Sequence, residues 1–580
     1  MSVRTRPSIG AGRVRGRFRL RPELLALEGR RLLSTFTVTS TADGGSAGTL
    51  RWAINQANTT SGANTIDFDP TVFGTPKVIT LSGSKLELSN ASGLQTIAGP
   101  AAGVTISGGE NSRVFQVDNG ATATLSGLTI TGGSGGASGD GLYNNGAATL
   151  TDCTITGNSA GVAGGGLANN TGTMTIVACT IGGNFGNVGG GVSNNGGAVT
   201  ISDSTISGNS AGIVNGGGLL NSSSSGTATL TDCTIVGNST PDGGGVANYY
   251  NGTLTLTDCT VSGNAAAGNG GGLRNIGTAT LTDCTVSGNA AGNTGGVANY
   301  RSVTFTDCTI SGNSASNIGG VFNGNTAALT NTIVASNVAG GNASDIIGMV
   351  TGSNNLIGTG GSGGLVNGQD GNLVGVAAPL LAPLGDHGGP TQTVALLPGS
   401  PAIGAGTAIS GLTTDQRGEP VGSSVDIGAF QSQGFTLTPV AGSTPQSTPA
   451  GTAFPNLLSV TVAANNPVEP ASGGGCELRR HTGQRWRLGD PVGHERGHRP
   501  ERRGRRRRHG RFDRRLVLRH GLGLGCRFTG HLRAHQRDRG DLQRPEQPEH
   551  HLRHLVRNPD WEALQRHAGP ARRERPDHAR

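Results

Sequence analysis

Six aspartates recur at regular intervals through the middle of the chain, each directly before a cysteine or a serine. They are Asp152, Asp203, Asp232, Asp258, Asp283 and Asp307. A line of carboxylates can hold Ca²⁺, which takes its ligands from oxygen atoms. A catalytic group, however, usually interrupts a repeat, whereas these residues belong to one. Because Asp at a strand start caps a turn through its own backbone, we expect turn residues, with a Ca²⁺ row as the alternative.

A column of cysteines accompanies the aspartates: Cys153, Cys179, Cys233, Cys259, Cys284 and Cys308, with Ser204 interrupting the series. If the repeats stack as coils, neighbouring Cα atoms lie about 4.8 Å apart, within the range that disulfides allow. We favour a packing ladder of small, buried thiols and keep paired disulfides as the alternative. No CxxC pair and no nearby His accompanies the repeats, which disfavours a metal site.

Basic residues are few in the repeats, but Arg274 and Arg301 lie in successive units near a glycine-rich turn, where they would form a small patch. The chain has no Ser/His/Asp constellation, phosphate loop or dinucleotide-binding fingerprint, and its glycine runs match none of these in context. We therefore assign no catalytic, cofactor-binding or metal-binding residue.

The elements that position these side chains follow from an internal repeat. The segment TLTDCTITGN, Thr149 to Asn158, returns almost unchanged four times between Thr229 and Asn313, and successive units are mostly 24 to 26 residues apart. Alternating β-branched residues predict short strands, and Gly and Asn predict corners. Three short strands and three turns make one coil of a parallel β-helix, so residues 76–377 would form about 12 coils of a single-stranded, all-β solenoid.

Stacking in register places like residues over like. In each Cys-Thr-Ile segment the first and third residues point inward and the Thr points outward. The triple glycines mark a place where backbones approach closely. Two asparagine columns suit the same geometry, because a side-chain amide donates to one coil and accepts from another. The first column is Asn158, Asn184, Asn209, Asn238, Asn264, Asn289, Asn313 and Asn337; the second is Asn144, Asn169, Asn194, Asn221, Asn248, Asn275, Asn299 and Asn323.

Composition agrees with a narrow interior. Of 580 residues 103 are Gly, while aromatic residues make up 3% and charged residues 14%. No strict Gly-X-Y period holds, which excludes collagen, and no apolar run reaches the roughly 18 residues of a membrane span. The net charge of +8 is an average: residues 1–34 carry nine Arg and two Glu, residues 35–475 carry seven basic and 21 acidic residues, and residues 476–580 carry 28 Arg and 13 acidic residues. The two ends carry the positive charge that would suit nucleic-acid binding, whereas the body between them is acidic.

The start of the body holds one amphipathic helix. In AGTLRWAINQAN, residues 47–58, Leu50, Ala53, Ile54 and Ala57 fall on one face, so we expect an N-terminal plug within a cap of residues 35–75. The stretch around it, with NTIDFD and VTISGGE, resembles the CSLREAI-type start of bacterial surface β-helix proteins. Residues 1–34 resemble an N-terminal sorting signal of planctomycete surface proteins, with a disordered basic arm as the alternative.

The end of the body shows a second resemblance. PLLAPLGDHGGPTQTVALLPGSPAIGAG, DQRGEP and VDIGAF, within residues 378–431, are similar to the choice-of-anchor Q domain, which implies a C-terminal cap. There we expect Asp386 and His387 to be turn residues and Asp415 with Arg417 to be a structural pair. The repeats resemble polymorphic outer-membrane-protein repeats and the right-handed β-helix region, and the right-handed coil is taken from that resemblance.

The composition changes abruptly after the cap. Residues 432–472 look like a linker and the truncated start of an immunoglobulin-like domain. Residues 473–580 hold 28 Arg and 12 of the 13 His but no Lys or Ile past Cys476. The run RRGRRRRHGR, Arg502 to Arg511, would suit a polyanion-binding arm, and the His residues with Cys476 would suit a metal. We favour an out-of-frame translation of a GC-rich gene, which would leave this tail disordered.

The sequence thus predicts a non-enzymatic, secreted or cell-surface β-helix protein with an adhesive or envelope role, whose outward Thr, Ser and Asn rows bind surface glycans or proteins. The alternative is a polysaccharide-active lyase or hydrolase on the same scaffold, which needs converging acids and a base on one outer face. Nucleic acid is expected as a partner only if the tail is genuine. No cofactor is expected apart from the Ca²⁺ alternative, and the oligomeric state is left open.

Overall fold

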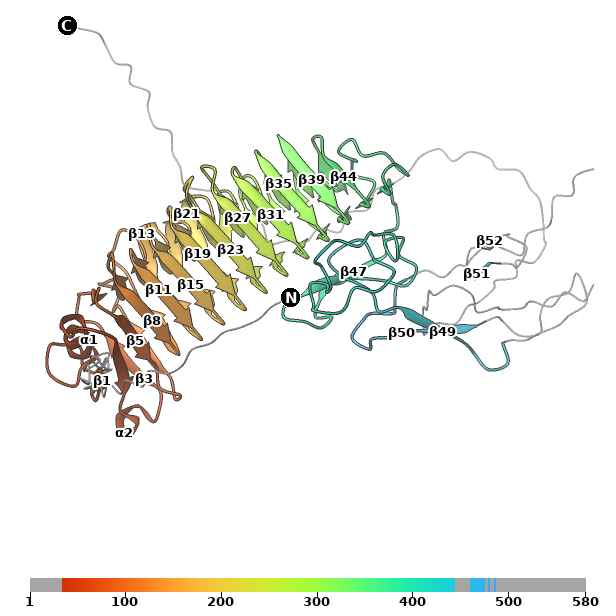
Figure 1. Ribbon diagram of the computed structural model, residues 1–580. Helices are drawn as coiled ribbons and strands as arrows, with labels where there is room; N and C mark the ends of the chain where they lie inside the picture. Colours follow the sequence, from red (N-terminus) through yellow and green to blue (C-terminus); the bar gives the residue numbers. More distant parts are fainter. Residues whose placement is uncertain (1–33, 444–458, 475–477, 480–484, 487–580) are drawn as a thin grey trace, which may run out of the picture. The chain divides into compact units, whose positions relative to one another are not determined.

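A computed structural model describes residues 34–443, 459–474, 478–479 and 485–486. Most of these residues form a parallel β-helix, in which successive coils stack along one axis (Figure 1). Four ladders of strands, here called sheets A to D, run along the stack, and all their strand pairs are parallel except β41 with β42. The all-β solenoid is therefore confirmed. Residues 1–33 and 487–580, the expected sorting signal and most of the basic tail, lie outside the described residues.

Sheets A and B each have 13 strands. Sheet A contains β1 (Ser34–Val38), β2 (Asn64–Phe68), β5 (Leu94–Ala98), β8 (Thr122–Ser126), β11 (Ala147–Thr151), β15 (Thr173–Val177), β19 (Ala198–Ser202), β23 (Thr227–Thr231), β27 (Thr253–Thr257), β31 (Thr278–Thr282), β35 (Ser302–Thr306), β39 (Thr326–Thr330) and β44 (Thr351–Ser353). Sheet B contains β3 (Lys77–Thr80), β6 (Val104–Ser107), β9 (Leu128–Thr131), β12 (Thr154–Thr156), β16 (Thr180–Gly182), β20 (Thr205–Ser207), β24 (Thr234–Val236), β28 (Thr260–Ser262), β32 (Thr285–Ser287), β36 (Thr309–Ser311), β40 (Ile333–Ala335), β45 (Leu356–Ile357) and β46 (Leu373–Val374).

Sheet C has 11 strands and sheet D has nine. Sheet C contains β4 (Leu86–Leu88), β7 (Phe115–Val117), β10 (Leu142–Asn144), β14 (Leu167–Asn169), β18 (Val192–Asn194), β22 (Leu219–Asn221), β26 (Val246–Asn248), β30 (Leu273–Asn275), β34 (Val297–Asn299), β38 (Val321–Asn323) and β43 (Ile346–Ile347). Sheet D contains β13 (Ser159–Ala163), β17 (Phe185–Val188), β21 (Ser210–Val214), β25 (Ser239–Thr240), β29 (Ala265–Ala266), β33 (Ala290–Ala291), β37 (Ser314–Ala315), β41 (Val338–Ala339) and β42 (Asn342–Ala343). Sheet D is a fourth ladder that the sequence did not predict, because six of its nine strands have only two residues and show no alternation.

The predicted N-terminal helix is α1 (Leu50–Thr59). Thr49 caps it, because its side chain accepts a hydrogen bond from the Trp52 N–H at 3.2 Å. The four apolar residues predicted for one face are all buried, and they join the core of the coils. A second, shorter helix, α2 (Pro70–Phe73), follows Asp69.

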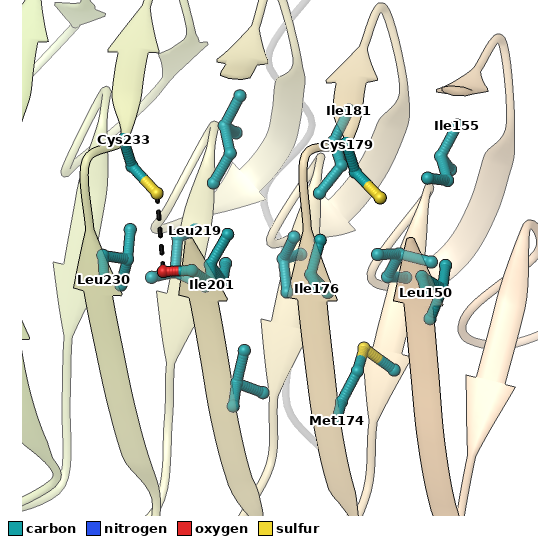
Figure 2. Packing of buried hydrophobic residues seen from close by; sticks show 14 of the residues in the cluster. Leu150, Ile155, Met174, Ile176, Cys179, Ile181, Ile201, Leu219, Leu230 and Cys233 are labelled. Atoms are coloured by element: carbon teal, nitrogen blue, oxygen red, sulfur yellow. Dashed lines mark hydrogen bonds between the residues drawn. The ribbon is translucent and has the colours of Figure 1, made fainter. Parts of the chain in front are cut away.

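The interior of the coils is a stack of aliphatic rows. Leu150, Ile176, Ile201 and Leu230 are partners in successive strands of sheet A, and Figure 2 shows them in a row from right to left on neighbouring strands. The same view shows the thiol of Cys233 directed at the Ile201 carbonyl oxygen, 3.5 Å away. Like residues therefore lie over like, as the repeat predicted.

Both asparagine columns are hydrogen-bonded ladders inside the coils. Each side-chain Nδ2 donates to the Oδ1 of the next coil, as Asn264 does to Asn289 at 3.0 Å and Asn248 to Asn275 at 2.8 Å. Every step of the two columns measures 2.7 to 3.0 Å. These amides are buried, so each ladder satisfies polar groups that would otherwise be costly.

The glycine runs lie where two coils approach closely. A Cβ atom on Gly244 would stand 2.4 Å from the carbonyl oxygen of Gly271, one coil away. Any side chain there would push the coils apart, which confirms the close backbone approach expected from the triple glycines.

The chain beyond the coils forms two antiparallel pairs, β47 (Leu381–Gly385) with β48 (Thr393–Leu396), and β49 (Phe435–Pro439) with β50 (Val460–Ala464). A two-residue pair, β51 (Leu478–Arg479) with β52 (Arg485–Trp486), follows. Residues 378–431 are called the cap below. Within the described part of the chain, helices are too short and too polar to cross a bilayer.

Candidate functional site

The aspartate column forms the corner between sheets A and B. All six residues have a left-handed backbone, with φ between 48° and 53°, and Ala178 and Asn331 occupy the same corner in their own coils. Asp and Asn tolerate this conformation better than other residues with a side chain. The turn prediction is therefore confirmed. Among the residues that the structure describes, no three His, Cys, Asp or Glu side chains come together in a group that could hold a metal ion.

The cysteine column is a ladder of free, buried thiols. Each Sγ donates to the backbone carbonyl oxygen two residues earlier, at 3.1 to 3.3 Å. Burial, together with neighbouring thiols, raises the pKa of Cys259 and Cys284 well above the ordinary value. These two thiols therefore stay protonated, and all six cysteines of the column pack in the core of the coils.

The candidate residues of the cap are structural. Asp386 Oδ1 accepts from the backbone N–H of Gly388 at 3.1 Å, which makes the expected turn. Arg417 and Asp415 pair at 2.7 Å with both side chains fully buried, and the guanidinium carbon lies 3.6 Å from the Phe430 ring centroid. Both predictions for these motifs are confirmed.

A polar surface that the sequence did not reveal lies on the outer face of sheet C. In each of these short strands the two flanking residues are buried in the coil, and the middle residue therefore points outward. Two arginines of this face carry tyrosine rings against them, Arg113 and Arg274. The chain contains four tyrosines, and all of them lie on or directly beside sheet C: Tyr143, Tyr249, Tyr250 and Tyr300.

The first group on this face, the Arg113 cluster, comprises Lys85, Glu87, Arg113, Gln116 and Asp118. The Gln116 side-chain oxygen accepts from Lys85 Nζ and from an Arg113 nitrogen, both at 2.7 Å. Its side-chain nitrogen donates to Asp118 at 2.6 Å and to Glu87 at 3.3 Å. Lys85 also pairs with Glu87 at 3.0 Å. Two carboxylates and two cations therefore converge on one amide.

Arg113 is partly withdrawn from water. Its guanidinium carbon lies 4.6 Å from the Tyr143 ring centroid, and burial lowers the pKa of Arg113. Asp140, next to it, is fully buried, and burial raises the pKa of its carboxyl. Among the residues that the structure describes, the Oδ1 of Asp140 and the Nε of Arg113 find no hydrogen-bond partner. The Arg113 cluster therefore rests on polar groups that are incompletely satisfied.

The second group, the Arg274 cluster, comprises Asn215, Asp242, Tyr249, Arg274 and Tyr300. One nitrogen of Arg274 contacts Asp242 Oδ2 at 2.9 Å, Asn215 Oδ1 at 3.0 Å and the Tyr249 hydroxyl. Its guanidinium carbon lies 5.0 Å from the Tyr249 ring centroid and 5.6 Å from that of Tyr300. Burial raises the pKa of both tyrosines, so their hydroxyls remain donors. The cluster is a fixed, charge-balanced platform.

Tyr250 extends from this platform into solvent. Its side chain is 68% exposed, and its ring centroid lies 5.9 Å from that of Tyr249. The backbone there is strained, because Tyr250 has a φ of 49° and the following Asn251 a φ of 70°. A bulky residue in this conformation costs about 1–3 kcal/mol and is a pointer to function.

A row of amides runs along the stack beside the cluster. Asp242 Oδ1 accepts from the Asn269 backbone N–H at 2.6 Å. Asn293 donates to Asn269 at 2.5 Å, and Asn317 donates to Asn293 at 2.9 Å. These side chains are partly or fully exposed, unlike the two interior ladders. They extend the polar platform over several coils.

The two clusters differ in what they can do. The Arg274 cluster has one carboxylate, and its cation is already engaged by three acceptors, so it offers aromatic faces and amides for binding. The Arg113 cluster holds two carboxylates, the number that glycoside hydrolysis requires. Of the two arginines singled out from the sequence, Arg274 lies in its cluster, whereas Arg301 lies in an exposed turn after Tyr300. The signal that sequence reasoning missed was the pair Tyr249 and Tyr300, which directly follow the second asparagine ladder, where four other coils have Asn or Ser.

Comparison with known proteins supports the fold. The family model described as "Right handed beta helix region" matches residues 96–264. No curated protein matches the chain. Among solved structures, that of pectate lyase Pel9A is 16% identical with a TM-score of 0.37, covering 69% of this chain and 96% of that one. The parallel strand ladders show that the fold is a parallel β-helix, and the family match over residues 96–264 supports a right-handed coil.

Proposed function

We propose that this is a non-enzymatic, extracellular or cell-surface protein that binds glycans on the outer face of sheet C. The binding platform is the Arg274 cluster together with Tyr250 and the row of amides. Aromatic rings offer a flat apolar face with a polar edge, and amides donate to and accept from hydroxyl groups. Both requirements for holding a sugar ring are met within neighbouring coils.

Tyr250 is the observation that carries this proposal. Its ring is 68% exposed on a backbone that only glycine adopts without strain. Packing does not account for this, because an exposed ring contributes little to folding. A role in contact with a ligand accounts both for the exposure and for the strain.

The proposed location outside the cell rests on composition. Residues 35–475 are rich in Gly, Thr, Asn and Ser and carry only seven basic residues. This low-charge, hydroxyl-rich body is typical of cell-surface proteins. The adhesive role follows from the repetition, because weak contacts repeated along the stack add to one another's effect.

A polysaccharide-active enzyme is the second candidate, and the Arg113 cluster favours it. Glu87 and Asp118 accept hydrogen bonds from the same Gln116 nitrogen, with Lys85 beside them. Neither the Ala168 nor the Ser193 coil repeats these groups, since small residues replace them on the outer face. Acids and a base that interrupt the repeat are the arrangement that a lyase or hydrolase would need.

The test is to apply the full-length protein to a glycan array and, in parallel, to incubate it with neutral and uronate polysaccharides. We expect retained glycans, loss of that signal in Arg274→Gln, and neither new reducing ends nor unsaturated products. An absence of glycan binding would overturn the proposal. Product formation that Glu87→Gln abolishes and Arg274→Gln spares would establish the enzyme instead.

A further inference from the structure

The cap covers the outer face of sheet B in three successive coils. Thr260, Thr285 and Thr309, which point outward like the other threonines of their column, are 0 to 1% exposed as a result. The side chain of Gln416 holds two of these coils together, since it donates to Thr260 Oγ1 at 2.8 Å and accepts from Thr285 Oγ1 at 2.6 Å. The backbone N–H of Ala429 donates to Thr309 at 3.1 Å. Docking therefore depends on neutral hydrogen bonds.

The same docking buries Asp283 and Asp307 of the aspartate column and partly buries Asp258; these three are called here the covered carboxylates. Asp283 and Asp307 are 5% exposed and line a pocket beneath the cap. Its other walls are mostly apolar: Ile409, Leu412, Val421 and Val425, with Thr407, Thr414 and Gln431. Asp203, in the same column but away from the cap, is exposed. The cap therefore places hydrocarbon over acids that neighbouring coils leave in water.

Few compensating groups face the covered carboxylates. The Asn331 side chain donates to Asp307 at 2.8 Å. None of the ion pairs in the described part of the chain includes them. Burial and the charges of neighbouring aspartates raise the pKa of Asp258 to about 7 and that of Asp283 to about 9. Burial raises the pKa of Asp307 to about 6.

The other charged groups on both sides of the contact do not relieve this burial. Asp232 lies below Asp258 in the column, and Asp415 adds a negative charge from the cap. Arg417 is turned to Asp415 at 2.7 Å and to Glu469 at 3.4 Å. Asp426 accepts from the backbone N–H groups of Gly404 and Ser432. His387 is partly buried, with its ring centroid 6.1 Å from that of Phe430, and it does not line the pocket.

We propose that the cap is a pH-sensitive clasp, which is held on sheet B while the covered carboxylates are protonated and loosens as they ionise. The direction follows from linkage. Below the ordinary pKa of Asp, near 4, the docked and released states are equally protonated, so docking is strongest there. As the pH rises towards 9 the docked state must give up protons that it holds more tightly. Docking therefore weakens, by up to about tenfold per pH unit for each group that titrates.

The peptide bond after Arg417 provides a built-in reporter of release, because Arg417 directly follows Gln416, whose side chain bonds to Thr260 and Thr285 of the coils. The Arg417 side chain is buried in the docked cap, whereas Arg301 is exposed on the coils. The full-length protein is treated with trypsin at pH 6 to 9, and mass spectrometry gives the rate of cleavage after Arg417 relative to that after Arg301. The ratio cancels the protease's own pH dependence. We expect it to rise at least about tenfold between pH 6 and pH 9, because cleavage follows the population of the open state.

Three substitutions decide the cause. Asp283→Asn is neutral at every pH and should keep the ratio low and nearly flat, and the partly exposed Asp258→Asn serves the same purpose if the first variant fails to fold. Asp203 lies in the same column but outside the clasp, so the cleavage ratio of Asp203→Asn should rise with pH as it does in the parent protein. A parent ratio that does not change with pH would overturn the proposal, and so would an equal rise in Asp283→Asn and Asp203→Asn.

Discussion

Ser204 Oγ accepts a hydrogen bond from the backbone N–H of Cys179 at 3.0 Å, and Cys179 Sγ accepts one from the backbone N–H of Cys153 at 3.3 Å. Ser204 also donates to the Ser202 carbonyl oxygen, as each thiol does to the carbonyl oxygen two residues before it. The serine that interrupts the cysteine column is therefore its functional equivalent. The column selects a small side chain with one donor and one acceptor.

Exchanging serine for cysteine in this column should hardly change the stability of the protein, whereas removing the hydrogen-bond donor should lower it. We expect Ser204→Cys to change the free energy of unfolding by less than about 1 kcal/mol, because both contacts persist. Cys259→Ala, at a fully buried position, should cost about 1–2 kcal/mol. Urea unfolding followed by circular dichroism measures both. A larger loss in Ser204→Cys than in Cys259→Ala would contradict the equivalence.

The buried asparagine ladder should be sensitive to a single missing step. Asn264→Ala removes the amide that donates to Asn289 and accepts from Asn238, leaving buried backbone and side-chain groups unpaired. We expect a loss of about 2–3 kcal/mol in unfolding free energy. Asn195→Ala, at an exposed position one residue past the other ladder, is the matched control and should stay within about 0.5 kcal/mol. Equal midpoints of thermal unfolding in the two variants would refute the ladder's role.

Ala178 is a position at which a substitution should stabilise the protein. Its φ of 53° matches the aspartate corner, yet alanine pays the full steric cost there. Ala178→Asn installs the residue that Asn331 already provides in an upper coil. We expect it to raise the unfolding free energy by about 0.5–1 kcal/mol, and Ala178→Val to lower it, as measured by urea denaturation. If valine were tolerated as well as asparagine, the corner would not be left-handed.

The sequence predicted what repetition controls. Stacking in register follows from the period, and with it came the two asparagine ladders, the buried thiols, the inward Cys and Ile of each segment and the apolar face of α1. The contacts of the cap and of the candidate site could not be predicted, because they join residues that no repeat relates. Thr260 meets Gln416 across more than 150 residues, and no periodic pattern announces which outward threonines a cap will cover.

The candidate site shows a similar limit. Tyr249 and Tyr300 occupy the place where four other coils have Asn or Ser, which is a visible departure from the repeat. Their meeting with Arg274 and Asp242, however, depends on which turns bring side chains over sheet C, and the loops that do so differ in length. The fourth ladder, sheet D, was missed because a pair such as Ala265–Ala266 is too short to alternate.

The covered carboxylates also predict a pH-dependent effect on stability. Burial raises the pKa of Asp283 to about 9, so its ionisation opposes folding progressively from about pH 4 upward. Asp283→Asn should therefore raise the unfolding free energy at pH 8 by about 1 kcal/mol or more and change it little at pH 4. Thermal unfolding at the two pH values checks this. A stabilisation of the same size at both pH values would show that ionisation is not the cause.

Tyr250 gives the most direct test of the glycan-binding face, because binding and stability should respond in opposite directions. Tyr250→Gly removes the exposed ring and relieves the positive φ, so the unfolding free energy should stay unchanged or rise by up to about 1 kcal/mol. Val78→Ala, which truncates an exposed side chain on sheet B, is the control for nonspecific surface effects.

The measurement is affinity gel electrophoresis of the full-length protein and both variants through gels that contain the polysaccharide best retained on the array, with thermal unfolding recorded on the same samples. We expect the polysaccharide to slow the migration of the parent protein and of Val78→Ala but not that of Tyr250→Gly. The unfolding temperature of Tyr250→Gly should not be lower than that of the parent protein. Retardation of Tyr250→Gly equal to that of the parent protein would contradict this expectation.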